Sequence, residues 1–233
     1  MIELLQQTSN LIGSISAIKE LEHKENARIL TISDSHGNYR LLAKIVKRFG
    51  PECDAMIFCG DGAKDIAELL ELANEDESFK SQVPSVIAFV RGNGDPDTYP
   101  VSFDIGRNNS NSENYPKGTV LFPYKQTLSV NGQKIYISHG HLEGVDFGYD
   151  KLGLQLKFNE CKTAIHGHTH IPHDSTEFGL KFVNPGSISR PRGGMPATFA
   201  ILTVGNNFID TAFIKINNTF DRDDSYNVTR ILV

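Results

Sequence analysis

The sequence predicts an α/β domain built around a parallel core sheet. Three β-rich runs alternate with two helical runs between residues 27 and 95. This β-α-β-α-β order favours parallel strands joined by right-handed crossovers. The 233 residues suit one large domain or two small ones, and no internal repeat is present. We expect an N-terminal helical extension over residues 1–26 and a single domain over residues 27–233.

Hydrophobic periodicity and turn residues place the elements of the first half. Residues 4–22 carry apolar side chains at helical spacing and predict the helix of the extension. Three strands are predicted in "ARILTIS", "CDAMIFCG" and "SVIAFVRGNGD". The helices between them are predicted in "RLLAKIVKRFG", which ends at a glycine, and in "IAELLELANE".

The second half of the sequence is predicted to form mostly strands. "QTLSVNGQKIYISHG" predicts a hairpin with its turn at Asn131-Gly132, a pair typical of tight β-turns. "TFAILTVGNNFIDTAFIKI" predicts a strand pair joined at Gly205-Asn206-Asn207, and "CKTAIHGH" and "LKFVNPGS" supply two more strands. The polar residues 106–118 are expected to form a mobile surface loop rather than a domain boundary.

Composition limits the classes of function. An apolar content of 39% and a charged content of 22% are typical of a soluble globular protein. The net charge of -5 makes a nucleic-acid partner unfavourable. No run of about twenty apolar residues predicts a membrane span, and the N-terminus lacks the pattern of a secretory signal. Three cysteines, an odd number without C-x-x-C spacing, favour the reducing cytoplasm.

Polar residues able to bind metal follow the β-rich runs. They stand in "TISDSHGN", "IFCGDG", "FVRGNGD", "IYISHGH" and "TAIHGHTH", and seven of the eight histidines lie in or beside these clusters. Ligands of open α/β sheets collect beyond the carboxyl ends of the strands. Five clusters at five strand ends are therefore expected to converge on one site.

The residue types indicate the chemistry of that site. Asp, His and Asn without cysteine suit Mn, Fe or Zn, and the histidines argue against a dedicated Mg or Ca site. Seven candidate ligands are too many for one ion: Asp34, His36, Asp61, Asn93, His139, His168 and His170. Two divalent ions sharing one carboxylate fit this number, and a bridging hydroxide would be the nucleophile in phosphoryl displacement. Manganese is the expected metal, with Ni, Fe, Zn or Co as alternatives.

Each cluster taken alone has a simpler interpretation. Asp34 and Asp61 each precede a predicted helix and could serve as its N-terminal cap. Asn93 could be an ordinary turn residue. We favour metal binding for all three because they stand in register with the other clusters.

In their order and spacing, "DSHGN", "GDG", "GNGD", "SHGH" and "GHTH" resemble the calcineurin-like metallophosphoesterases. Within that family the chain is most similar to the small bacterial and archaeal phosphodiesterases of the YfcE type. The resemblance runs from about residue 28 to about residue 215 and includes "NPGSIS". It implies a four-layer α/β/β/α sandwich of two mixed sheets flanked by helices. It also implies a small phosphoester substrate.

The resemblance also assigns roles to the matching positions. These are Asp34, His36 and His170 for the first ion, Asp61 for the bridge, and Asn93, His139 and His168 for the second ion. Asn38 would contact substrate or orient a ligand, and His141 would contact the phosphate or support the ligands. His166 is expected to support the ligands or to be structural. Asp61, Asn93 and His141 are thus the expected catalytic residues.

One position departs from the broad family. Many members carry a histidine after the Gly-Asn pair, taken as the acid that protonates the leaving oxygen, and here that position is Gly94. We therefore expect better activity on activated diesters than on alkyl monoesters. The alternatives are a phosphomonoesterase or protein phosphatase of the same fold, or a metal-binding scaffold without activity. The apolar stripe of residues 4–22 needs a partner, either the domain itself or another copy in a homodimer or higher oligomer.

Overall fold

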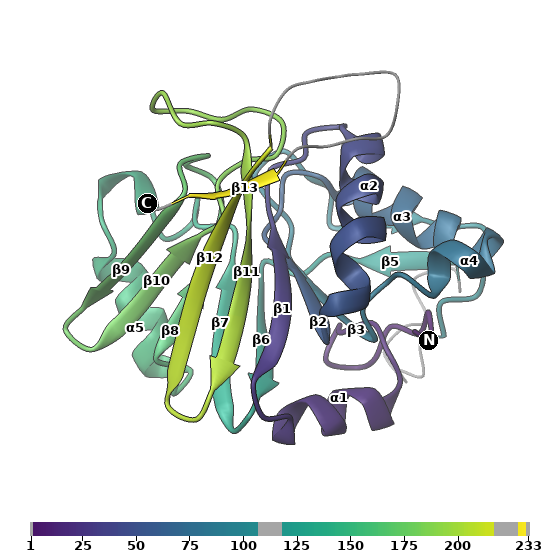
Figure 1. Cartoon of the computed structure of the whole chain (residues 1–233), viewed down its shortest axis with the longest axis horizontal. Helices are drawn as coiled ribbons and strands as arrows, with labels where there is room; N and C mark the ends of the chain where they lie inside the picture. Colours follow the sequence, from purple (N-terminus) through teal and green to yellow (C-terminus); the bar gives the residue numbers. More distant parts are fainter. Residues whose placement is uncertain (1, 107–117, 217–227, 232–233) are drawn as a thin grey trace.

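The computed structural model describes residues 2–106, 118–216 and 228–231, and it contains two large mixed sheets packed face to face (Figure 1). The larger sheet has the strand order β13-β12-β11-β1-β2-β3. Its strands are β1 (Ala27–Ile32), β2 (Ala55–Phe58), β3 (Val86–Phe89), β11 (Thr198–Gly205), β12 (Phe208–Ile216) and β13 (Val228–Ile231). β1, β2 and β3 are parallel, and the last three strands extend the sheet antiparallel beside β1.

The smaller sheet has five strands in the order β6-β7-β8-β10-β9. They are β6 (Lys125–Val130), β7 (Gln133–Ser138), β8 (Thr163–Ile165), β9 (His173–Glu177) and β10 (Leu180–Asn184). β7, β8 and β10 are parallel neighbours, while β6 and β9 form antiparallel edges. The predicted turn at Asn131-Gly132 joins β6 to β7, and both of its residues have positive φ.

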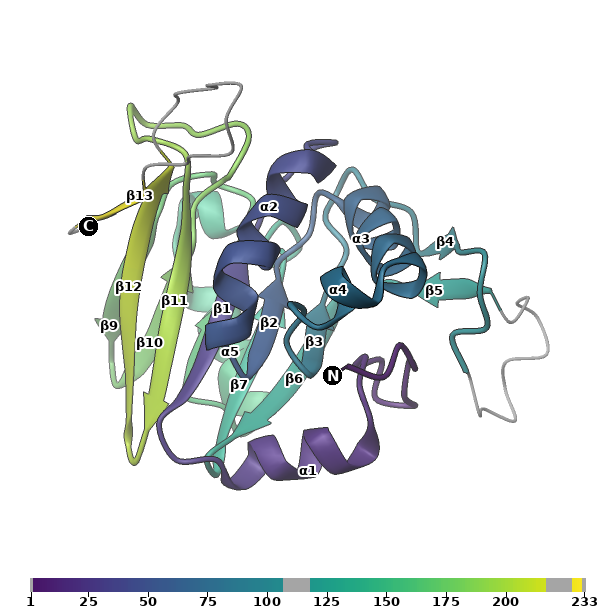
Figure 2. The same ribbon diagram turned by 45° about the vertical axis from the view of Figure 1, so that its right-hand side comes forward.

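Helices cover the outer face of each sheet. α2 (Tyr39–Phe49) and α3 (Ala63–Glu75) are the two crossovers of the parallel strands, and they bury their apolar faces on the larger sheet (Figure 2). α5 (Asp150–Phe158) covers the smaller sheet through Leu152 and Leu156. A separate apolar core, which includes Ile57, Ile137 and Leu202, lies between the sheets. The predicted four-layer sandwich is confirmed.

The N-terminal segment differs from its prediction. Helix α1 covers only Ile15–His23, not residues 4–22. Ahead of it, Ile12 pairs with Ile87 through backbone hydrogen bonds, and the Gln6 side chain bonds the backbone of Leu121. Gly13 has φ 141°, a value outside the helical range, so the helix cannot extend back through this residue. Long-range pairing thus overrode helical periodicity in this segment.

Several short elements were not predicted. They are α4 (Glu77–Lys80), the β4–β5 pair (Thr98–Pro100 and Thr119–Leu121), α5, β9 and β13. β9 escaped detection because its sequence "HDSTE" is polar, as suits a partly exposed edge strand. The predicted loop at 106–118 falls almost wholly outside the described residues. Among the helices that are described, none has the length and apolar character needed to cross a bilayer.

Candidate metal centre

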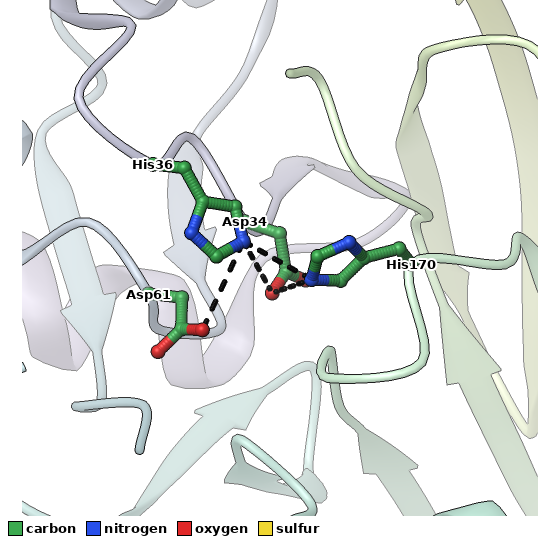
Figure 3. Close-up of side chains that lie close together, drawn as sticks. All are labelled: Asp34, His36, Asp61 and His170. Carbon is green, nitrogen blue, oxygen red and sulfur yellow. Dashed lines mark hydrogen bonds and ion pairs between the residues drawn. The ribbon is translucent and has the colours of Figure 1, made fainter. Parts of the chain in front are cut away.

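Four ligand-type side chains from three loops meet at the carboxyl ends of the parallel strands. Asp34 and His36 follow β1, Asp61 follows β2, and His170 follows β8 (Figure 3). One ligand atom from each lies within 4.8 Å of the ligand atoms of the other three. These are the three residues expected to hold the first ion together with the expected bridge.

The distances within this group suit coordination of one cation. His170 Nε2 lies 3.1 Å from both His36 Nε2 and Asp34 Oδ1, and His36 Nε2 lies 3.8 Å from Asp61 Oδ2. Two ligand atoms bound to one ion at about 2.1 Å and at right angles are separated by roughly 3 Å. The group therefore has the spacing of ligands around an ion.

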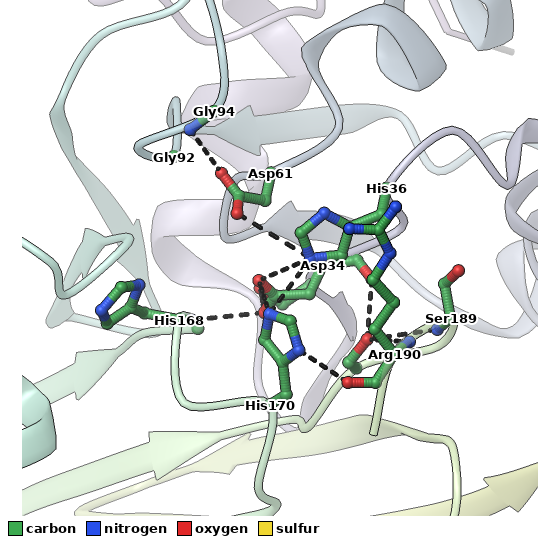
Figure 4. Close-up of polar contacts among 12 residues, drawn as sticks. Asp34, His36, Asp61, Gly92, Gly94, His168, His170, Ser189 and Arg190 are labelled. Carbon is green, nitrogen blue, oxygen red and sulfur yellow. Dashed lines mark hydrogen bonds and ion pairs between the residues drawn. The ribbon is translucent and has the colours of Figure 1, made fainter. Parts of the chain in front are cut away.

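Backbone carbonyls orient two of the histidine rings. His170 Nδ1 lies 2.6 Å from the Arg190 carbonyl (Figure 4). His139 Nδ1 lies 2.6 Å from the Cys59 carbonyl. A carbonyl only accepts, so Nδ1 donates in each ring, and Nε2 is the nitrogen left to bind a cation once it is deprotonated. The loop that carries "NPGSIS" thus orients His170 through Arg190.

Buried atoms without partners show that a cation fits. Among the described residues, His139 Nε2 is buried and has no hydrogen-bond partner, and buried Asp34 Oδ1 has none beyond its contact with His170 Nε2 at 3.1 Å. His139 Nε2 lies 4.0 Å from Asp34 Oδ1 and 3.7 Å from Asp61 Oδ2. Buried polar atoms are rarely left unpaired, and here ring nitrogens face carboxylate oxygens. A divalent ion would satisfy all of these atoms together.

The charge state of Asp34 also suits a cation. Burial by itself would raise the pKa of this fully buried carboxyl, but the contacts with His170 and His139 outweigh it and lower the pKa. Asp34 is therefore ionised at neutral pH. A buried carboxylate of this kind needs a compensating positive charge.

The remaining predicted ligands lie around this group but outside it. His139 is adjacent, as its distances show. His168 stands edge-on to the His139 ring at 5.2 Å, while its Nε2 lies 2.8 Å from Asp146 Oδ2. Asn93 is exposed in the turn after β3. The structure thus assembles the first-ion set and the expected bridge more closely than the second-ion set.

The expected substrate contacts occupy different places. The His141 ring lies 5.4 Å from the His139 ring, and burial, then His139 and His168, lower its pKa. Asn38 caps helix α2, because its side chain accepts a hydrogen bond from Leu41 N at 3.4 Å. His166 is fully buried, and its Nδ1 lies 3.3 Å from Asn184 Nδ2.

The backbone at the site is unusual. Five of the expected ligands have left-handed φ values: Asp34 (55°), His36 (45°), Asp61 (55°), His168 (71°) and His170 (61°). Residues with a Cβ rarely adopt this conformation, which costs of order 1 kcal/mol or more for each. Such strain concentrates where a function requires particular side-chain directions. The loops therefore fix the directions of these five side chains, and this lowers the stability of the fold.

Glycines let the loops approach one another. A Cβ at Gly167 would overlap Ser33 Oγ and lie 2.7 Å from Asp34 Oδ2, and a Cβ at Gly60 would lie 2.8 Å from His139 Nδ1. A Cβ at Gly92 would overlap the Asp61 carboxylate. The small residues between the ligands are thus a steric requirement of the site.

Two further carboxylates support the loops of the site. Asp95 accepts hydrogen bonds from Gly62 N (3.2 Å), Ala63 N (2.9 Å) and Gly92 N (2.9 Å). Asp95 thereby caps helix α3, so that the Asp61 side chain is not needed as the cap and is available to bind metal. Its place in "GNGD", beside a ligand candidate, was the only signal available.

The second supporting carboxylate is Asp65, in the first turn of α3. It accepts hydrogen bonds from Ser35 Oγ and Gly37 N, the two residues that flank His36. Burial raises its pKa. Asp65 therefore ties the loop after β1 to helix α3.

Comparisons with known proteins identify the family. Residues 28–207 match the calcineurin-like phosphoesterase superfamily domain. The chain is 29% identical over 185 residues to the probable metallophosphoesterase YsnB of Bacillus subtilis, covering 79% of this chain and 89% of YsnB. It is 26% identical over 181 residues to the phosphodiesterase YfcE of Escherichia coli, covering 75% and 86%.

Solved structures share the fold. A predicted phosphoesterase from Streptococcus pneumoniae matches with a TM-score of 0.57 at 22% identity, covering 89% of this chain and 99% of that one. Vacuolar protein sorting 29 from Cryptosporidium parvum also matches with a TM-score of 0.57, at 17% identity, covering 89% and 98%. With a domain match over most of its length and a ligand cluster at the strand ends, this chain belongs to the calcineurin-like phosphoesterase superfamily.

Proposed function

We propose that this protein is a metal-dependent phosphodiesterase that uses two divalent ions, with manganese as the expected metal, on a small phosphoester. The observation that carries the proposal is the pair of buried atoms Asp34 Oδ1 and His139 Nε2, which lie 4.0 Å apart beside the Asp61 carboxylate and make no hydrogen bond to each other. The relatedness to a phosphodiesterase of Escherichia coli supports the choice of reaction.

The residues divide into two sets in this proposal. Asp34, His36 and His170 would hold one ion, and Asn93, His139 and His168 the other, with Asp61 shared. Bound divalent ions would lower the pKa of water towards neutrality and neutralise charge on the phosphate.

The chain's own contacts keep the ligands ready. Gly94 N donates to Asp61 Oδ1 at 3.0 Å (Figure 4). Asp61 Oδ2 then lies 3.8 Å from His36 Nε2 and 3.7 Å from His139 Nε2. His141, whose ring lies 5.4 Å from the His139 ring, could supply a hydrogen bond to a substrate oxygen.

Gly94 is the reason for proposing a diester with a good leaving group. It is exposed and offers only a backbone N–H, already used on Asp61. No side chain at this position can protonate a leaving oxygen. Esters whose leaving group has a low pKa need little assistance from an acid, whereas alkyl esters need much more.

The first test is a substrate and metal panel. The protein would be loaded with Mn, Ni, Co or Mg and assayed on bis(p-nitrophenyl) phosphate and on an alkyl monoester such as glycerol phosphate. We expect a much larger kcat/KM for the aryl diester, highest with a transition metal. Equal efficiency on the two substrates would refute the proposed preference.

A second test restores an imidazole at Gly94. A Cβ there would lie 3.4 Å from Asp61 Oδ1, an ordinary contact. Gly94→His should therefore raise alkyl-monoester hydrolysis by about 10-fold or more relative to diester hydrolysis. Gly94→Ala, which adds the Cβ without the ring, is the matched control. The same change in both variants would contradict the role assigned to this position.

The alternatives predict different results. A phosphomonoesterase or protein phosphatase would prefer p-nitrophenyl phosphate or a phosphopeptide to the diester. A scaffold would bind metal without turnover on any substrate of the panel.

Self-association belongs to the same proposal. Leu154 and Phe158 on α5 and Phe178 in the β9–β10 turn are 63%, 82% and 101% exposed. Apolar side chains of this size at the surface favour a homodimer or higher homo-oligomer. Analytical ultracentrifugation of the wild type and of Phe158→Ser would test this, and a monomeric wild type would refute it.

A further inference from the structure

We propose that Asp146 is a positioning residue for the second ion, because it holds His168 Nε2 and leaves Nδ1 of that ring to bind the ion. This inference rests on the proposed two-ion site. Asp146 lies in the loop after β7, outside every motif that the sequence singled out.

The contact itself is short and directional. Asp146 Oδ2 lies 2.8 Å from His168 Nε2. A carboxylate accepts and a ring N–H donates, so the proton of a neutral His168 sits on Nε2. Nδ1 then carries the lone pair. The ring stands edge-on to His139, whose own Nε2 is unpartnered, so both rings border the same space.

Two other histidines are oriented in the same way, but with the roles of the two ring nitrogens exchanged. His139 and His170 each direct Nδ1–H to a backbone carbonyl and keep Nε2 for an ion. In His168 the outer acceptor is a carboxylate on Nε2. A carboxylate is a stronger acceptor than a carbonyl, and it raises the basicity of the ligating nitrogen. Asp146 would thus strengthen a site whose other unshared ligands, Asn93 and His139, are neutral.

The loop that carries Asp146 is built to hold it. The 3-10 turn Val145–Phe147 begins after Gly144, which has φ 66°. Val145 is buried in the core beneath α5, and its N–H bonds the carbonyl of Gly140 at 3.2 Å. An exposed ion pair on a mobile surface contributes little. Here one neighbour of Asp146 is anchored, so the carboxylate is held beside His168.

A metal titration tests the inference. Wild type, Asp146→Asn and Asp146→Glu would be titrated with Mn²⁺ by calorimetry, starting from metal-free protein. We expect Asp146→Asn to weaken the second binding event by about 10–100-fold and to leave the first within about 2-fold. Asp146→Glu should recover part of the loss. Asp150→Asn removes an exposed carboxylate four residues away and is the matched control, expected to bind both ions as the wild type does.

Nitrogen-15 NMR of the metal-free protein gives an independent readout. The wild-type His168 ring should be the Nε2–H tautomer, and Asp146→Asn should shift it towards a mixture. An unchanged second binding event in Asp146→Asn overturns the inference. A tighter second event overturns it as well, because Asp146 would then compete with the ion. If the wild type binds only one ion, the two-ion proposal fails and this inference fails with it, whereas two binding events with an unchanged second one in Asp146→Asn overturn this inference alone.

Discussion

Replacing Asp95 by alanine should weaken both the fold and the metal centre. Its carboxylate accepts hydrogen bonds from Gly62 N and Ala63 N at the start of α3 and from Gly92 N in the turn after β3. Asp61 lies between these two segments and receives Gly94 N from the same turn. One half-buried carboxylate therefore joins the loop of the proposed bridging ligand to the turn that carries Asn93.

The cost can be worked from these contacts. Losing an N-terminal cap costs about 1 kcal/mol, and losing a favourable charge at the helix N-terminus costs about 0.3–1 kcal/mol. The third hydrogen bond, from Gly92 N, adds about 1 kcal/mol. The sum is about 2–3 kcal/mol. With an unfolding entropy of about 2.1 cal/mol/K per residue, this corresponds to a fall in Tm of about 4–6 °C for a chain of this length.

Thermal unfolding of the metal-free protein, followed by calorimetry, measures this directly. Asp97→Ala is the matched control, since Asp97 is an exposed acid two residues further along. Mn²⁺ titration of Asp95→Ala should also show weaker binding, because Asp61 loses its support. A Tm within about 1 °C of the Asp97→Ala value would refute the reasoning, since it would mean that water replaces the carboxylate at no cost.

Three further predictions follow from the structure. Asn93→Ala and His168→Ala should each lower kcat by about 100-fold or more while the far-UV circular dichroism stays native, and full rates would contradict their proposed roles. Gly167→Ala should reduce the free energy of unfolding by about 1–3 kcal/mol, because the new methyl group meets Asp34; a wild-type denaturation midpoint would contradict this. Burial raises the pKa of Cys53 to about 12, so a thiol reagent at pH 8 should label it only after unfolding, and rapid labelling of the native protein would contradict this.

The candidate ligands could be identified from the sequence because strand ends in an α/β sheet meet in space. Asp34 and Asp61 each end a buried parallel strand, so their convergence followed from topology alone. The alternative that these two residues cap helices is decided by the structure, where Asn38 and Asp95 do the capping. Local sequence cannot distinguish a cap from a ligand, since both require a short polar side chain before a helix.

The N-terminal segment shows why periodicity can mislead. Its apolar residues do become buried, as Leu4 and Ile12 show, but residues 2–13 are not helical. Their backbone and side chains find partners on β3 and β5 instead. Spacing along the chain reports that a segment is amphipathic, whereas the partner that satisfies its backbone is set by the rest of the fold.

The sequence by itself determined the alternation of strands and helices, the order of the metal-binding motifs and the family they indicate, because these depend on local patterns along one chain. Only the tertiary structure decided which groups contact and orient each of these side chains. It paired Asp146 with His168, Asp95 with α3 and the Arg190 carbonyl with His170. These partners lie 20 to more than 30 residues apart along the chain, and their meeting depends on the packing of the two sheets and on backbone turns that no short sequence pattern encodes.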